Sequence, residues 1–328
     1  MSESNNFYSL DPNLILEVAE KNGYSPTGEL IQLNSYENRV FDVRLNLNEG
    51  TPLHALQDRG SLIAKFYRPN RWTRETILDE HHFIAELRSN DIEVAPTLKL
   101  NTSYDSIGET HGMYFSFFEK VRGRLVQELT EAHLLKLGRW LARLHNVGCQ
   151  KKSLHRATLG PTNDNKWDIL DKLLERVSPE VVGRYEEAAI TIFEKLDEEL
   201  LNHNFIRTHG DLHRGNILEN STGDFIVIDF DDMINGPEMQ DFWMLLPSAE
   251  AEGPEFEALV KGYSDLRRFP EEQLNLVPLL RGYRIITYAM WIMNRWSDPS
   301  FKKVFSEFGE YSYWAEETES LERISYKI

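Results

Sequence analysis

Three oxygen-bearing side chains near the middle of the chain have a spacing that suits phosphoryl transfer. Asp211 and Asn216 lie in the segment 209–216, His-Gly-Asp-Leu-His-Arg-Gly-Asn, and Asp229 follows in the segment 228–231, Ile-Asp-Phe-Asp. One carboxylate can orient an attacking hydroxyl and accept its proton, and an amide with a second carboxylate can hold Mg²⁺ against nucleotide phosphates. We therefore expect Asp211 to be the catalytic base. Asn216 and Asp229 are the expected Mg²⁺ ligands, with Asp229 also required for catalysis.

A lysine in an apolar segment supplies the cation that such a site needs. Lys65 interrupts the strand pattern of residues 62–67, where an unpaired ammonium would be costly to bury. In the helix expected at about 73–89, Glu80 lies on the apolar face, three residues after Ile77. We expect a Lys65–Glu80 ion pair that places the ammonium at the α- and β-phosphates of ATP. The alternative is an edge-strand lysine and a separate surface glutamate.

Two further segments are expected to contact the nucleotide. Ser35 lies in the segment 34–40, which precedes a predicted strand and lacks the Gly-x-Gly-x-x-Gly pattern. Ser35 and nearby backbone N–H groups would cover the phosphates, unless this segment is a plain β-turn. The segment 115–121, which contains Glu119, should link two lobes. Its backbone would hydrogen-bond the adenine edge, unless it is only a buried strand that ends in a connector.

Several residues near the motifs are expected to support the structure rather than to take part in the reaction. His209 is expected to be a buried, hydrogen-bonded side chain that fixes the loop, and Asp241 to cap a helix or support the catalytic loop. We interpret Asp231 and Asp232 as solvated turn acids rather than metal ligands. His213 and Arg214 either face phosphate or substrate, or lie on the loop surface. Four late aromatic residues are expected in a helix core rather than in a cation cage: Tyr283, Tyr288, Trp291 and Trp296.

Composition limits the class of protein. A length of 328 residues fits about two domains, and a net charge of −17 argues against a general nucleic-acid binder or adhesion to anionic membranes. The same charge permits a cationic substrate. The single cysteine, Cys149, excludes an internal disulfide and fits a reducing compartment, and we expect it to be a small buried side chain. The N-terminal residues show no basic region or apolar run, so we expect a cytoplasmic protein.

The patterns along the chain predict an α+β fold with two lobes. Residues 28–66 are strand-rich, a turn is expected at 48–52, and another strand pair at about 97–100 and 113–118. Beyond Thr130, an apolar stripe predicts a helix that ends before Gly148. Further amphipathic segments are at 167–176, 183–203, 255–267 and 272–296. We expect a small β-rich N-lobe at residues 1–119 and a larger, mostly helical C-lobe at residues 120–328.

The two motif segments resemble the signature of the kinase-like superfamily in its aminoglycoside/choline phosphotransferase branch. Four other segments are similar to the bacterial stress response kinase A family, and the similarity spans nearly the whole chain. They are Leu-Asn-Ser-Tyr-Glu-Asn-Arg-Val at 33–40, Lys-Phe-Tyr-Arg-Pro-Asn-Arg-Trp at 65–72, Asn-Gly-Pro-Glu-Met-Gln-Asp-Phe-Trp-Met-Leu-Leu at 235–246 and Trp-Ile-Met-Asn-Arg-Trp-Ser-Asp-Pro at 291–299.

This resemblance implies a protein kinase-like fold and a cytoplasmic serine/threonine protein kinase that depends on ATP and Mg²⁺ and acts in stress survival. By position, it implies that Asp211 is the catalytic aspartate, that Asn216 and Asp229 bind the metal, and that Ser35 is the ATP-site serine. The expected partner is a protein with a serine or threonine acceptor, and we expect a monomer without nucleic-acid or membrane partners. Because Asp231 replaces the glycine of Asp-Phe-Gly and no Ala-Pro-Glu segment follows, activation by loop phosphorylation is not expected.

Other functions are open at this stage. The main alternative is a small-molecule kinase that acts on an amino-alcohol or aminoglycoside, since such enzymes share the signature and the acidic chain suits a cationic acceptor. A nucleotide-binding protein without turnover is disfavoured by the intact set of Lys65, Asp211, Asn216 and Asp229. A purely structural helical scaffold leaves the polar ends of the strands unexplained.

Overall fold

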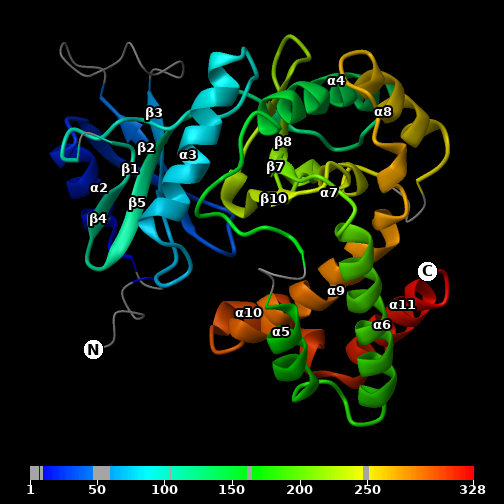
Figure 1. The fold of residues 1–328 in the computed structure, drawn as a ribbon. Helices are drawn as coiled ribbons and strands as arrows, with labels where there is room; N and C mark the ends of the chain where they lie inside the picture. Colours follow the sequence, from blue (N-terminus) through cyan, green and yellow to red (C-terminus); the bar gives the residue numbers. More distant parts are fainter. Residues whose placement is uncertain (1–6, 8–9, 47–59, 104, 161–164, 247–250) are drawn as a thin grey trace.

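The chain forms a sheet-based lobe and a helical lobe that lie side by side (Figure 1). The computed structural model describes residues 7, 10–46, 60–103, 105–160, 165–246 and 251–328. The turn predicted at 48–52 lies outside these residues. The expected α+β architecture, with a β-rich first part and a mostly helical second part, is confirmed.

The first lobe is built on a five-stranded antiparallel sheet with the order β1-β2-β3-β5-β4. Alternating residues of β2 and β3 pack with helix α2 in an apolar core, as the period of two in the sequence predicts. The elements of this lobe are α2 (Pro12–Lys21), β1 (Pro26–Leu33), β2 (Arg39–Leu45), β3 (Ser61–Phe66), α3 (Arg74–Ser89), β4 (Gly108–Thr110) and β5 (Met113–Glu119).

Strand register directs Lys65 away from this core. Ala64 and Phe66 belong to the core under α2, so Lys65 between them faces the opposite side of the sheet. Helix α3 lies on that side, between the sheet and the helical lobe (Figure 1). Thr73 caps α3 by accepting a hydrogen bond from the backbone of Thr76. The predicted helix at 73–89 is therefore confirmed.

The strand predicted at 97–100 is not a full strand. Thr97 forms an isolated bridge to Phe118, and the backbone N–H of Leu98 donates to the Phe117 carbonyl at 2.8 Å. The strand that pairs regularly with β5 at this edge is β4 instead. The segment still contributes to the first core, because Leu98 and Leu100 are buried there.

The second lobe is mostly helical, and its predicted helices are present within a few residues of the expected bounds. Its helices are α4 (Glu131–Gly148), α5 (Lys166–Leu174), α6 (Val182–Leu200), α7 (Met239–Trp243), α8 (Pro254–Ser264), α9 (Leu276–Asn294), α10 (Pro299–Val304) and α11 (Tyr311–Ser325). Short 3₁₀ helices are η2 (Arg214–Asn216), η3 (Phe230–Asp232), η4 (Glu271–Gln273) and η5 (Ser306–Gly309).

Two small antiparallel sheets position the motif segments inside this lobe. One has the order β6-β8-β9, and the other pairs β7 with β10. The strands are β6 (Arg124–Leu125), β7 (Ile206–Thr208), β8 (Ile217–Glu219), β9 (Phe225–Val227) and β10 (Ile234–Gly236). Strands β7 and β9 thus end directly before the two motif segments.

Two expectations from composition can be compared with the structure. Cys149 is exposed, so its predicted burial is wrong. It comes directly after the last residue of α4, outside the buried face of that helix. Among the helices of the described ranges, none combines the length and the apolar character needed to cross a bilayer.

Candidate active site

The loop that carries Asp211 is held tightly from within. The buried imidazole of His209 contacts the carbonyl oxygen of Ile228 at 3.0 Å, which ties the two motif segments together as predicted for this residue. Gly210 has φ +83°, and a Cβ there would lie 2.0 Å from the backbone oxygen of Asp232. A side chain at position 210 would therefore both strain the backbone and push the segments apart.

Asp241, near the start of the short helix α7, supports the same loop. Its buried carboxylate accepts hydrogen bonds from the backbone N–H groups of His209 at 2.8 Å and Gly210 at 2.9 Å. His145 of α4 lies 3.3 Å from the same carboxylate. The predicted supporting role of Asp241 is confirmed, and it fixes the backbone directly before Asp211.

The structure brings Asn216 next to both aspartates. The backbone oxygen of Asn216 accepts a hydrogen bond from the N–H of Ile228 at 3.0 Å, directly before Asp229. Its side-chain Nδ2 donates to the carbonyl of Asp211 at 2.9 Å, which leaves Oδ1 as the atom available to a cation. Asp229 has φ 62° and ψ 66°, a left-handed conformation that is strained for a non-glycine residue and typical of functional positions.

Lys65 contacts carboxylates of both lobes. Its Nζ lies 3.8 Å from Glu80 Oε1, 3.2 Å from Asp229 Oδ1 and 3.1 Å from Asp231 Oδ1. The predicted Lys65–Glu80 pair is therefore present. Burial lowers the pKa of Lys65, but the three neighbouring carboxylates outweigh it and hold that pKa well above its usual value. The ammonium is therefore charged, and its position is fixed by both lobes.

Asp231 differs from its prediction as a solvated turn acid. Its carboxylate is buried between Lys65 and Arg71, whose Nη1 lies 2.6 Å from Asp231 Oδ2. Arg156 adds a second buried guanidinium, which contacts Glu80 at 2.9 Å and the backbone oxygen of Asp231. The sequence gives no local signal for these arginines, because they come from distant segments. The acid after Asp229-Phe230 is thus an internal anion rather than a solvated one.

Asp211 is paired with a residue that the motif analysis missed. Arg284 on α9 donates to Asp211 Oδ1 at 2.8 Å, and His213 Nε2 lies 3.5 Å from the other carboxylate oxygen. Burial raises the pKa of Asp211, but the hydrogen bond from His213 and the charge of Arg284 outweigh it and lower that pKa to about 2. The carboxylate is ionised at neutral pH.

The segment around Ser35 is a loop that reaches the helical lobe. Ser35 Oγ accepts a hydrogen bond from the backbone N–H of Asn38 at 3.2 Å. Glu37 Oε2 accepts a hydrogen bond from the indole Nε1–H of Trp291 at 2.6 Å, and Arg295 contacts the same carboxylate oxygen. Residues 35–38, which we call the phosphate loop for its expected role, are thereby tied to α9.

The late aromatic residues have two different environments. Tyr283 packs against Phe193 and Trp296 against Phe308, as expected of a helix core. Tyr288 stacks on Trp291 but is 37% exposed, so the core prediction is wrong for it. Trp291 instead joins Phe301 and Phe305 in a cluster against Tyr36 of the phosphate loop.

Glu119 ends β5 where the chain passes from the sheet to the helical lobe. Its backbone N–H donates to the Pro96 carbonyl at 2.9 Å, so this amide is already used. The Glu119 side chain is buried. An adenine edge at this connector would therefore use other backbone groups than the amide of Glu119.

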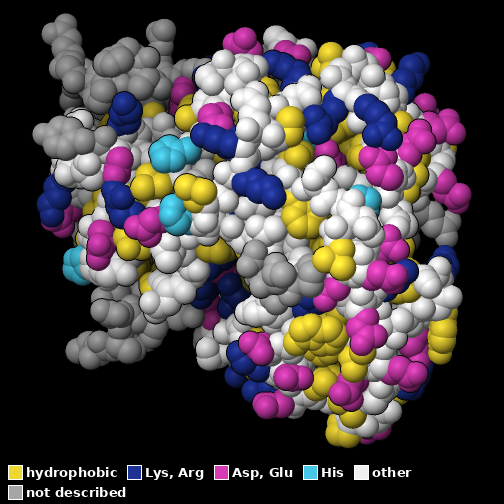
Figure 2. All heavy atoms as spheres, viewed as in Figure 1, with side chains coloured by type: hydrophobic (Ala, Val, Ile, Leu, Met, Phe, Trp, Pro, Cys, Tyr) yellow, Lys and Arg dark blue, Asp and Glu magenta, His cyan; other side chains and the backbone are white. Residues whose placement is uncertain are grey.

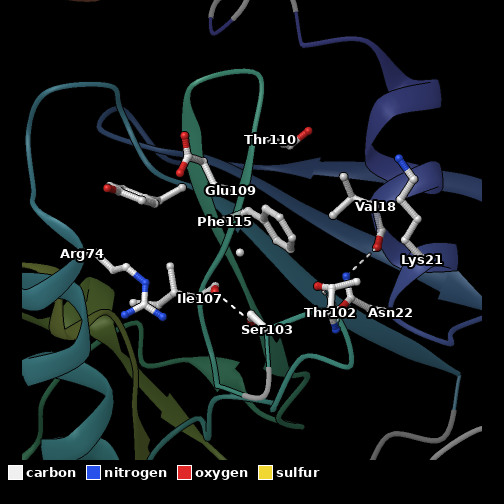
Figure 3. A pocket seen from close by; sticks show the side chains of 12 residues that line it. Val18, Lys21, Asn22, Arg74, Thr102, Ser103, Ile107, Glu109, Thr110 and Phe115 are labelled. Carbon is white, nitrogen blue, oxygen red and sulfur yellow. Dashed lines mark hydrogen bonds between the residues drawn. The ribbon is translucent and has the colours of Figure 1, made fainter.

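A cavity on the sheet lobe is separate from the predicted site residues. A cavity of about 360 Å³ is lined by residues of α2, α3, β4 and β5, including Lys21, Arg74 and Phe115 (Figure 3). None of the predicted site residues lines it. In the space-filling view, basic and acidic side chains lie together in the hollow between the lobes (Figure 2).

Sequence comparison assigns the chain to a family. The profile of the "Phosphotransferase enzyme family" matches residues 30–272. "Stress response kinase A" of Escherichia coli strain K12 is 31% identical over 318 residues, covering 95% of this chain and 92% of the relative. "Serine/threonine protein kinase RdoA" of Salmonella typhimurium strain LT2 is 31% identical over 332 residues, with the same coverage.

Solved structures agree with the fold. An amicoumacin kinase in complex with AMP-PNP and Ca²⁺ has a TM-score of 0.73 at 18% identity, covering 98% of this chain and 95% of that chain. A microcompartment-associated aminopropanol kinase has a TM-score of 0.73 at 20% identity, covering 97% and 98%. From these matches, the chain belongs to the phosphotransferase enzyme family, is related over nearly its full length to stress response kinase A, and is an enzyme that acts as a kinase.

Proposed function

We propose that this kinase transfers the γ-phosphate of ATP to a serine or threonine hydroxyl of a protein. The observation that carries this proposal is the convergence of Asp211, Asn216 and Asp229 opposite the buried ammonium of Lys65. Phosphoryl transfer needs little covalent chemistry from the protein and depends on positioning and charge neutralisation. This set of side chains provides both.

Each side chain has a proposed task. Asp211 orients the acceptor hydroxyl and receives its proton, which its ionised state allows. Lys65, held by Glu80, binds the α- and β-phosphates. Ser35 and backbone N–H groups of the phosphate loop cover the phosphates, and backbone groups near Glu119 hold the adenine.

The proposed metal is Mg²⁺, held by Asn216 and Asp229. The donor set fits this ion, because both side chains offer oxygen and the amide nitrogen of Asn216 is already used. In the described part of the chain, no three His, Cys, Asp or Glu side chains are grouped so as to hold a metal by themselves. This agrees with an ion that takes its remaining ligands from phosphates and water. When bound, Mg²⁺ would neutralise phosphate charge.

A protein acceptor is supported by one relative that is named as a serine/threonine protein kinase. The cation beside Asp211 also disfavours the ammonium group of an amino-alcohol or aminoglycoside close to the reacting hydroxyl. Acidic side chains on the visible face of the helical lobe are scattered rather than gathered in one patch (Figure 2). We further propose a role in stress response, a cytoplasmic location, and a monomer with the lobe boundary at residues 119 and 120.

The direct test is transfer of radiolabelled γ-phosphate from Mg²⁺-ATP. Acceptors are the protein itself, generic basic and acidic proteins, and a panel of amino-alcohols and aminoglycosides, with Asp211→Ala as the control. Label on protein serine or threonine that disappears in the variant supports the proposal. Label on a small molecule alone would replace it with the small-molecule kinase, and ATP binding without transfer to any acceptor would contradict both.

A further inference from the structure

Arg284 is the least fully paired of the three arginines that contact the site carboxylates. In the part of the chain that the structure describes, Asp211 is the one carboxylate in contact with its guanidinium. By contrast, Arg71 contacts three carboxylates, and Arg156 contacts one carboxylate and two backbone carbonyls. A guanidinium has five N–H donors. Arg284, whose side chain is 36% exposed, therefore keeps most of its donors for another acceptor.

The position of these donors limits what they can bind. An acceptor hydroxyl must lie within about 3 Å of Asp211 to give up its proton, and the phosphorus must lie about 3–3.5 Å from that hydroxyl oxygen. Arg284 Nη2 is already 2.8 Å from Asp211 Oδ1. These distances put the transferring group within reach of the Arg284 guanidinium.

A purely electrostatic partner for Asp211 is a poor explanation for this arginine. A cation beside a base weakens that base as a proton acceptor. In a loose, metaphosphate-like transition state, positioning and charge neutralisation at the equatorial oxygens supply most of the catalysis. An arginine at this point fits that need, because its planar fork can bind the base and a phosphoryl oxygen at the same time.

Helix α9 holds Arg284 beside further contacts that reach the site. One turn beyond Arg284, Tyr288 lies under its guanidinium at 5.8 Å from the ring centre. Further along the same helix, Trp291 and Arg295 contact Glu37 of the phosphate loop. The helix that carries Arg284 thus also contacts the loop expected to cover the nucleotide.

We propose that Arg284 binds the γ-phosphoryl group during its transfer, as an arginine supplied from α9 within the same chain. This inference rests on the proposed function. In the step, the acceptor oxygen forms a bond to the γ-phosphorus, and the bond from that phosphorus to the β,γ-bridging oxygen breaks. ADP leaves with the electron pair, and the acceptor proton passes to Asp211. Arg284 stabilises the charge on the equatorial oxygens and is neither protonated nor deprotonated.

The test compares the binding of Mg²⁺-ADP with that of Mg²⁺-ADP and aluminium fluoride, which imitates the transferring group and needs no acceptor. Calorimetric titrations use the full chain as wild type, Arg284→Gln and Arg284→Lys. Arg281→Gln is the matched control, because its guanidinium lies on the same helix but near the ring of Trp243. We expect Arg284→Gln to weaken the aluminium fluoride complex about 100-fold and to change Mg²⁺-ADP affinity less than threefold. Arg284→Lys should retain part of the lost affinity.

Several outcomes would overturn the inference. Equal weakening of both ligands by Arg284→Gln would indicate a merely structural role, and no weakening of either would show that Arg284 does not bind the group. If the wild type binds Mg²⁺-ADP but its affinity does not increase with aluminium fluoride, the inference on Arg284 is contradicted while the proposed function is not. Wild-type protein that does not bind Mg²⁺-ADP at all contradicts the proposed function. If Arg284→Gln does not fold, Arg284→Lys provides the same comparison.

Discussion

Two groups of charged side chains meet between the lobes, and they differ in how completely their charges are paired. The buried group contains Lys65, Glu80, Arg156, Asp231 and Arg71, and every cation in it has two or more acceptors. The open group contains the pair of Asp211 and Arg284, whose side chains are 15% and 36% exposed.

This difference indicates that the buried group supports the structure of the site, whereas the open group takes part in the reaction. In the buried group, each charge is fixed by several neighbours, which sets the position of the Lys65 ammonium before any nucleotide binds. In the open group, Arg284 keeps unused donors and the Asp211 carboxylate remains partly accessible. We therefore expect changes in the buried group to act first on stability, and changes in the open group to act first on turnover.

Asp229 belongs to both groups, because it contacts Lys65 and lies beside the Asp211 loop. We expect Asp229→Ala to remove Mg²⁺-dependent turnover, with a loss of roughly 10³-fold or more, since it deletes a proposed metal ligand. The measurement is turnover against Mg²⁺ concentration. Asp224→Ala, in an exposed turn, is the matched control. Full turnover by Asp229→Ala at ordinary Mg²⁺ would remove Asp229 from the metal site.

Arg156 tests the buried group alone. Its substitution by Gln removes the cation 2.9 Å from the buried Glu80 and leaves only Lys65, at 3.8 Å, to balance that carboxylate among the described contacts, so we expect the free energy of unfolding to fall by about 3–5 kcal/mol. Denaturant titration measures this change. Arg268→Gln removes the same charge from a side chain that is 79% exposed, and should change stability by less than about 1 kcal/mol. Equal stability of the two variants would contradict the claim that the buried group stabilises the fold.

Contacts between neighbouring elements could be predicted from the sequence better than contacts between distant segments. Strand alternation and helix periodicity placed Lys65 and Glu80 on facing surfaces, and the structure shows them 3.8 Å apart. These signals concern residues of one element and its neighbour. Arg156 and Arg284 reach the site from segments far along the chain, where periodicity carries no information on which distant carboxylate a guanidinium will contact.

The errors have the same physical origin. The prediction of Asp231 as a solvated turn acid is wrong because two cations of the first lobe, Lys65 and Arg71, contact its carboxylate. Tyr288 is predicted to lie in a helix core together with the other late aromatic residues. It is 37% exposed because the face of α9 that carries Arg284 borders the site rather than another helix.

His81 gives a pH-dependent test of the buried region. Burial, followed by the charges of Lys65 and Arg156, lowers its pKa to about 3. The unfolded state, with a histidine pKa near 6.5, therefore binds a proton that the folded state does not. Stability present above pH 6.5 is lost as pH falls, by about 1.4 kcal/mol per pH unit for this group.

The variant His81→Gln isolates this contribution, because Gln can retain contacts with Tyr67 and Ser106. Between pH 7 and pH 5, we expect the free energy of unfolding of the wild type to fall by about 2 kcal/mol more than that of the variant. Denaturant titrations at both pH values measure this difference. Parallel pH dependences of wild type and variant would show that His81 is not held neutral.

Trp291 tests the contact between α9 and the phosphate loop. Trp291→Phe keeps an aromatic ring against Tyr36 but removes the N–H that donates to Glu37. Loss of this charge-assisted hydrogen bond should weaken loop closure by about 1 kcal/mol and raise the KM for ATP about fivefold. Trp167→Phe is the control, because Trp167 is 40% exposed and lies on a different helix, α5. An unchanged KM would mean that this tie does not affect nucleotide binding.

The measurement that tests the central claim most directly is the turnover of Asp211→Asn with saturating Mg²⁺-ATP, together with its ATP affinity. Asn keeps the size of the side chain but cannot accept the acceptor proton. We expect kcat to fall by about 10²–10⁴-fold, while ATP affinity and the unfolding midpoint stay close to those of the wild type. A folded Asp211→Asn protein with near-wild-type kcat would contradict the claim that Asp211, in the open group, is the catalytic base.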